Sequence, residues 1–110
     1  MEQVLLVMTN VPDGATARTL ASHLIAEKLA ACVNILPAVR SIYRWEGLIE
    51  ETEEVTLLIK TVQARYAILE TAIKTLHPYQ LPEIIAIPIV DGLPSYLGWV
   101  AQETKKDVDV

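Results

Sequence analysis

Polar side chains that could bind a ligand gather in the segment HPYQLPEI, residues 77–84. Histidine is a common metal ligand as neutral imidazole and a common general base, so His77 is the first candidate. Tyr79 lies between two prolines, and Glu83 adds a carboxylate near the end of the segment. This pattern is typical either of a rigid corner between two elements or of a corner that directs side chains into a binding site.

A second group of polar residues lies at the ends of two predicted strands. Cys32 and Asn34 open the strand predicted over residues 32–45, and Lys60 closes the strand predicted over residues 50–61. A deprotonated cysteine binds soft ions such as copper. Structural roles stay open beside these: Cys32 packed in the core, His77 capping a helix end, and Glu83 in a surface ion pair with Lys60.

The catalytic signatures that a sequence can carry are missing from this one. It has no glycine-rich phosphate loop, no nucleophile elbow and no metalloprotease histidine pair. The loop after the first predicted strand has no arginine before Arg18, which disfavours an acylphosphatase-like site. The sequence therefore carries none of these signatures, and the expectation of a binding protein and not an enzyme follows from the family resemblance given below.

The length and composition of the chain limit the number of domains, the kinds of partner and the location of the protein. The chain has 110 residues, which predicts a single domain over 1–110, and a net charge of −5, which disfavours nucleic-acid binding. Its one cysteine excludes an intrachain disulfide and a multi-cysteine zinc site. It has neither a leader pattern nor an apolar stretch of membrane length, so we expect a cytoplasmic protein that does not bind membranes.

Hydrophobic periodicity predicts four strands and three helices. The strands are expected at residues 4–8, 32–45, 50–61 and 83–90, and the helices at 15–31, 62–76 and 95–103, followed by a frayed tail at 107–110. The first and third strands are continuously apolar, which is typical of central strands, whereas Pro37 and Pro88 mark the second and fourth as edges. The order predicts an α+β ferredoxin-like βαββαβ fold with sheet order 4-1-3-2, both helices on one face, and a short C-terminal helix.

The strand over residues 32–45 is expected to place its odd-numbered residues, from Val33 to Trp45, on one face, with an edge position or a bulge at Pro37. The hairpin that turns at Glu46-Gly47 is expected to extend past the rest of this small domain and to carry Tyr43 and Trp45 with it. Since 52% of the residues are hydrophobic, we expect part of the apolar surface to be buried between the subunits of a closed cyclic oligomer. The alternative is that the tryptophans are packed in the core of one chain.

Five motifs in order together resemble the CutA divalent-cation-tolerance family. They are LAACVNI (29–35), SIYRWEG (41–47), LLIKT (57–61), HPYQLPEI (77–84) and YLGWV (96–100). The resemblance covers nearly the whole chain. It implies a PII-like homotrimer built by strand pairing between subunits, with a role in binding or tolerance of divalent ions such as copper.

The resemblance also implies site residues. Those carried over to the inter-subunit cleft are Cys32, Asn34, Tyr43, Trp45, Lys60, His77, Tyr79 and Glu83. Met8 and Leu76 stand where some members of the family have copper-binding cysteine and histidine. We therefore expect a weakly bound divalent ion, copper or zinc, held by His77, Cys32 and Glu83 and shared between subunits, with no organic cofactor.

Two other hypotheses stay open from the sequence. One is a PII-like or ACT-like regulatory module that binds a small ligand in the inter-subunit cleft. The other is a cofactor-free isomerase or hydrolase with His77 as base and Lys60 as its electrostatic partner.

Overall fold

The elements follow one another along the chain much as the periodicity predicts. A computed structural model describes residues 2–106, so the predicted tail at 107–110 lies outside the described residues. The elements are β1 (Val4–Val11), α1 (Gly14–Ala26), β2 (Cys32–Trp45), β3 (Leu48–Val62), a 3₁₀ turn (Gln63–Arg65), α2 (Tyr66–Leu76), β4 (Ile85–Pro88) and α3 (Pro94–Glu103).

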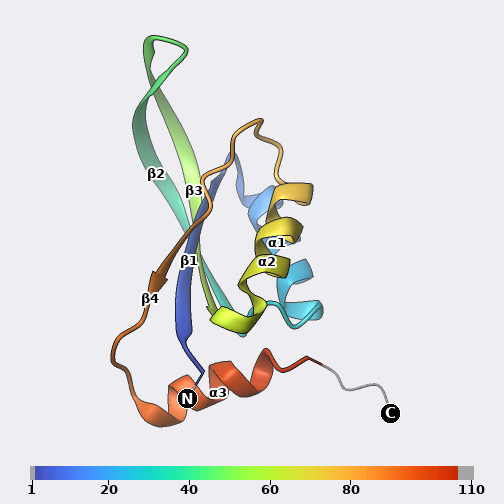
Figure 1. Ribbon diagram of the computed structural model, residues 1–110. Coiled ribbons are helices and arrows are strands. Elements are labelled where there is room, and N and C mark those ends of the chain that lie inside the picture. Colours follow the sequence, from blue (N-terminus) through green and yellow to red (C-terminus); the bar gives the residue numbers. More distant parts are fainter. Residues whose placement is uncertain (1, 107–110) are drawn as a thin grey trace.

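Within residues 2–106 the strands form one sheet in the order β2-β3-β1-β4, and every neighbouring pair is antiparallel. This confirms the ferredoxin-like order 4-1-3-2, with β1 and β3 central and β2 and β4 at the edges. Helices α1 and α2 lie side by side on one face of the sheet, and α3 lies across the end where the chain begins (Figure 1). The sheet face opposite α1 and α2 is called the open face below.

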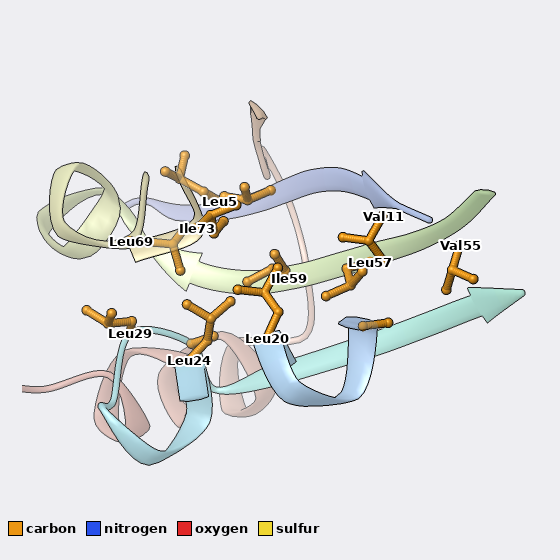
Figure 2. Packing of buried hydrophobic residues seen from close by; sticks show 13 residues of the cluster. Leu5, Val11, Leu20, Leu24, Leu29, Val55, Leu57, Ile59, Leu69 and Ile73 are labelled. Atoms are coloured by element: carbon orange, nitrogen blue, oxygen red, sulfur yellow. The ribbon is translucent and has the colours of Figure 1, made fainter. Parts of the chain in front are cut away.

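The core fills the space between α1, α2 and the sheet (Figure 2). Leu20 and Leu24 of α1 and Leu69 and Ile73 of α2 are fully buried there, at the spacing that places them on one side of each helix. Figure 2 shows them pointing at alternate residues of β1 and β3, including Leu5, Val11, Leu57 and Ile59. This burial of one sheet face and one stripe per helix stabilises the layer arrangement.

Helix α1 ends at Ala26 and not at residue 31 as predicted. Lys28 has a φ of 57°, a left-handed conformation that stops a helix. The backbone N–H of Leu29 then donates to the Leu24 carbonyl at 2.9 Å, and that of Lys28 to the Ile25 carbonyl at 3.1 Å. These are the two bonds of a Schellman motif, formed here without the glycine that usually marks it in a sequence.

Other boundaries move by a few residues. Strand β1 runs on to Val11, because it pairs with β3 as far as Val55. Strand β4 is shorter than predicted, and only Ile85–Pro88 pair with β1. Helix α2 begins after a 3₁₀ turn and ends at Leu76 before Pro78, as predicted.

The prediction that β2 keeps one set of residues on one face is wrong. The register against β3 shifts between Leu36 and Val39, so the strand has a bulge at Pro37 and Ala38, and Ala38 has a φ of 60°. A bulge inserts one residue and reverses the alternation beyond it. Tyr43 and Trp45 therefore share the open face with Cys32, although their numbers have opposite parity.

The hairpin of β2 and β3 extends well beyond the helices (Figure 1). Its turn is Glu46-Gly47, as predicted, and both residues have positive φ, of 49° and 81°. This combination matches the twist of the flanking strands. Within residues 2–106 no helix is long and apolar enough to cross a membrane.

Candidate functional site

The segment from His77 to Ile84 leaves the end of α2 and leads past the base of the hairpin to β4 (Figure 1). His77 ends α2: its backbone N–H donates to the Ile73 carbonyl at 2.8 Å, and its own backbone is extended, with φ −77° and ψ 133°. Pro78 enforces that change, because the residue before a proline avoids the helical region. The prolines thus set the path that brings the side chains of this segment to the sheet.

The His77 ring is buried, with 8% of the residue exposed. Its Nε2 lies 2.7 Å from the Asn10 carbonyl oxygen, and its Nδ1 lies 3.2 Å from the Tyr79 backbone nitrogen. Since a backbone N–H can only donate, Nδ1 is the acceptor, and Nε2 carries the hydrogen that it donates to Asn10. Both ring nitrogens are therefore engaged in holding the segment against β1.

Asn10 is the centre of this network, and the sequence analysis missed it. Its Oδ1 accepts a hydrogen bond from the Thr56 hydroxyl at 2.6 Å, and its Nδ2 donates to Glu83 Oε1 at 3.4 Å. The ion pair of Glu83 with Lys60, which the sequence left open, is not formed, because Glu83 bonds to Asn10 and Lys60 bonds to Asn34. A polar residue that ends an apolar strand next to a turn was the available signal in the sequence.

Tyr79 joins the segment to the hairpin. Its hydroxyl donates to Glu54 Oε2 at 2.8 Å, and Glu54 is itself only 7% exposed. Burial raises the pKa of Tyr79 well above its ordinary value, and the hydrogen bond to the negative Glu54 carboxylate raises it further. Tyr79 therefore stays a neutral hydrogen-bond donor at any physiological pH.

A groove of about 850 Å³ lies between the hairpin and this segment. Tyr43 and Trp45 border it from β2, Glu54 from β3, and Tyr79, Leu81 and Glu83 from the segment before β4. The bulge in β2 makes this possible, because it turns Tyr43 and Trp45 to the face on which Glu54 lies. The structure thus brings together Tyr43, Trp45, Tyr79 and Glu83 of the predicted site residues.

Cys32, Asn34 and Lys60 form a separate cluster nearer α3. Cys32 and Lys60 are register partners, and Lys60 Nζ lies 4.0 Å from Cys32 Sγ and donates to Asn34 Oδ1. Tyr96 of α3 reaches the same place, where burial, and then the neighbouring Cys32, raise the pKa of the Tyr96 hydroxyl. The cluster is partly exposed on the open face.

The two groups do not meet within one chain. Asn10, which holds His77 and Glu83, pairs with Thr56, whereas Cys32 pairs with Lys60 four residues further along β3. Four residues of strand span about 13 Å. Among residues 2–106 no three His, Cys, Asp or Glu side chains are grouped to hold a metal ion. The metal-binding roles of His77, Cys32 and Glu83 therefore stay predictions, and His77 and Lys60 are not placed as a catalytic pair.

Fold and site together define a class: a small ferredoxin-like domain with an uncovered sheet face and a ligand-sized groove at one end of that face. The family model described as "CutA1 divalent ion tolerance protein" matches residues 5–103. The chain belongs to this family.

Relatives match over nearly their full length. The divalent-cation tolerance protein CutA of Thermus thermophilus is 47% identical over 104 residues, which cover 94% of this chain and 99% of that protein. The crystal structure of CutA1 from Oryza sativa superposes with a TM-score of 0.92 at 39% identity, covering 96% of this chain and 97% of that one. The structure titled periplasmic divalent cation tolerance protein CutA, from Archaeoglobus fulgidus, superposes with a TM-score of 0.90 at 35% identity, covering 93% and 99%.

Proposed function

We propose that this chain takes part in tolerance to divalent cations by binding a divalent ion, copper or zinc, weakly and between the copies of a homotrimer. It does so as a binding protein and not as an enzyme, and without an organic cofactor. Membership in the CutA1 family over residues 5–103 carries this proposal. The relatives' names refer to divalent cations and to no reaction.

The surface of the chain supports an assembly of copies. Large apolar side chains on the open face are exposed, among them Leu36, Ile85 and Ile87. Strands β2 and β4 each have one edge that pairs with no other strand among residues 2–106. Exposed edges and an apolar face of this kind favour pairing with another chain. A closed ring of three copies would pair the free strand edges and bury the apolar face, and a closed ring does not grow into fibres.

The distribution of candidate ligands supports a shared and weak site. Imidazole, thiolate and carboxylate suit copper and zinc, but His77 and Cys32 lie in separate groups within one chain. A site that uses both must combine residues from different copies. Both nitrogens of His77 are already hydrogen-bonded, so a metal at either one displaces a protein partner and binds less tightly.

Calorimetric titration with Cu²⁺ and with Zn²⁺ tests the role of His77. The wild type is compared with His77→Ala and with His23→Ala, which removes an exposed histidine on α1. We expect weaker binding for His77→Ala and unchanged binding for His23→Ala. Unchanged affinity in a correctly folded His77→Ala would exclude His77 as a ligand. Glu83→Gln and Cys32→Ser then test the other two predicted ligands.

One observation favours a second candidate function. The groove beside Tyr79 has the volume of a small-molecule site, which suits a PII-like or ACT-like regulatory module. A ligand that binds only the native state raises the unfolding temperature. Stabilisation by a metabolite in a metal-free buffer supports this alternative, and stabilisation by divalent ions alone supports the first.

Two further parts of the proposal rest on the sequence. The acidic net charge argues against nucleic-acid partners. A cytoplasmic location is our expectation, although the relative from Archaeoglobus fulgidus is titled periplasmic. Fractionation of cells that produce the untagged protein tests the location directly.

A further inference from the structure

The groove between the β2–β3 hairpin and residues 77–84 contains a nearly buried carboxylate with one hydrogen-bond partner. We propose that this groove binds an organic ammonium group, with Glu54 as its counter-ion and aromatic rings as its walls. The proposal rests on the second candidate function, because it names the class of ligand for the same groove. Its test is carried out without metal, so its failure is distinguishable from a failure of divalent-ion binding, in which Glu83 is also a predicted ligand.

Glu54 is the residue that most requires an explanation. It is 7% exposed, and its Oε2 accepts the Tyr79 hydroxyl at 2.8 Å. Among residues 2–106 its other carboxylate oxygen has no hydrogen-bond partner and its side chain forms no ion pair, although that oxygen is not fully buried and faces the groove with some access to water. Buried carboxylates are costly unless a cation or several donors compensate them. A cationic ligand in the groove supplies that compensation.

The aromatic rings that border the groove suit a cation. Tyr43, Trp45 and Tyr79 all line it. The Tyr43 hydroxyl is held by Thr52 at 3.1 Å, and the Tyr79 ring lies against His77 with centroids 4.8 Å apart, so both rings have fixed positions. Aromatic faces attract alkylammonium groups through their quadrupoles, and rings held in place beforehand lose little freedom when a ligand binds.

The charges around the groove favour a cation over an anion. Glu54 and Glu83 line it against one cation, Arg44. Arg44 stands between Tyr43 and Trp45 in β2, so alternation directs its side chain from the opposite face of the strand. Among residues 2–106 Arg44 forms no ion pair with Glu54. A bare metal ion fits less well, because the described residues offer it no group of three ligands.

The second carboxylate suggests a ligand with two positive centres. Glu83 bonds to Asn10, Asn10 bonds to Thr56, and Thr56 lies two residues from Glu54 along the same strand face. Both carboxylates line the same groove, so a diamine can place one ammonium group against each of them. A groove of about 850 Å³ has room for the alkyl chain beside the rings.

The test is calorimetric titration of the native assembled protein with putrescine, in buffer containing EDTA. Butylamine serves as the probe with one positive charge and succinate as the anionic probe. We expect putrescine to bind more tightly than butylamine, and succinate not to bind. Glu54→Gln should weaken putrescine binding about 10- to 100-fold, the usual effect of losing a charged hydrogen-bond partner. Trp45→Leu should weaken it as well, through loss of the cation–π contact.

Glu53→Gln is the matched control. Glu53 is the neighbour of Glu54 in β3 and pairs with Arg40, so its side chain leaves the other face of the strand. It removes the same charge, and binding should stay within about twofold of the wild type because exposed charges are screened. No binding of putrescine, or equal loss in both Glu variants, overturns the proposal. The proposal is also overturned if Glu54→Gln changes the number of copies in the native assembly but leaves the amine affinity unchanged. That result would mean that a basic side chain of another copy, and not a ligand, pairs with Glu54.

Discussion

Two buried threonines on the helix-facing side of the sheet differ in one respect. The Thr61 hydroxyl donates to the Leu29 carbonyl at 2.7 Å, whereas the Thr9 hydroxyl has no hydrogen-bond partner among residues 2–106. Both side chains are fully buried. Valine has nearly the same shape as threonine but no hydroxyl, so the same substitution isolates the hydrogen bond at each position.

We therefore expect opposite effects on stability. Thr9→Val should raise the free energy of unfolding by about 1 kcal/mol, because it removes an unpaired buried hydroxyl. Thr61→Val should lower it by about 1 kcal/mol, because it leaves the Leu29 carbonyl without its donor. Urea unfolding at one fixed protein concentration measures both. Destabilisation by Thr9→Val would show that its hydroxyl has a partner in solution.

The raised pKa of Tyr79 predicts how stability depends on alkaline pH. The folded state holds this proton more tightly than the unfolded state, whose tyrosines titrate near 10. The stabilisation is fully present below that pH and is lost as the pH rises through the higher pKa of the folded state. Burial and Glu70 raise the pKa of Tyr66 to about 12, which adds a background slope of the same sign.

At pH 8, Tyr79→Phe should be less stable than the wild type, because the substitution removes the hydrogen bond to Glu54. Between pH 9 and 11, however, the variant should lose less stability than the wild type does. Urea midpoints across this range measure the two slopes. Tyr43→Phe is the control, because it removes a tyrosine hydroxyl that, within the described part of the chain, bonds to Thr52 and to no carboxylate. Parallel curves for the wild type and Tyr79→Phe would contradict the predicted role of Glu54.

At the scale of the elements, local patterns were sufficient for most of the fold. Proline positions marked both edge strands, and continuous apolar runs marked the central ones, because burial on both faces requires such runs. The end of α1 was not predictable, since a lysine takes the left-handed position there. The reversal of side-chain faces beyond the β2 bulge was not predicted either. Pro37 indicates an irregularity in the strand but does not show whether a residue is inserted.

The bulge itself gives a prediction. Ala38 has a φ of 60°, which costs an L-residue about 1–2 kcal/mol, whereas glycine adopts it freely. Part of the gain from Ala38→Gly is offset by the greater freedom of glycine in the unfolded chain, so we expect stabilisation of about 0.5 kcal/mol. Ala38→Val should destabilise by about 1 kcal/mol or more, because a β-branched residue avoids this region.

Thermal unfolding of the three proteins under one set of conditions orders them as Gly, Ala and Val from most to least stable. Gly47→Ala serves as a reference, since Gly47 has a φ of 81° and nothing lies within 4 Å of an added Cβ. Its loss of stability reports the cost of the positive φ without any steric clash, reduced by the smaller freedom of alanine in the unfolded chain. An Ala38→Val variant as stable as the wild type would show that β2 can pair without the bulge.

At the scale of the whole molecule, the sequence predicted four of the residues that line the groove, Tyr43, Trp45, Tyr79 and Glu83, but not the arrangement of the groove. His77, Tyr79 and Glu83 could be predicted because they lie close together in the sequence. Asn10 and Glu54 could not, because they reach the same place only through the pairing of β1 with β3. The separation of Cys32 from His77 also depends on register, which no local pattern of this chain specifies.

The exposed apolar face gives the prediction that belongs to the whole molecule. Ile87 is 46% exposed in β4 and pairs with Leu6, which points to the open face. If three copies cover this face, Ile87→Lys places a charge in a buried interface, and the assembly should dissociate or weaken strongly. Ile68 of α2 is 52% exposed on the helical side, so Ile68→Lys should leave the assembly intact.

Native mass spectrometry and sedimentation of the wild type and both variants at several concentrations distinguish these cases. The wild type and Ile68→Lys should have about three times the chain mass of 12.2 kDa, and Ile87→Lys should shift toward one copy on dilution. A wild type that stays a folded single copy when dilute would overturn the trimer. It would also remove the arrangement in which His77 and Cys32 can hold one ion together, since Thr56 and Lys60, the β3 residues beside which the two groups lie, are about 13 Å apart within each chain.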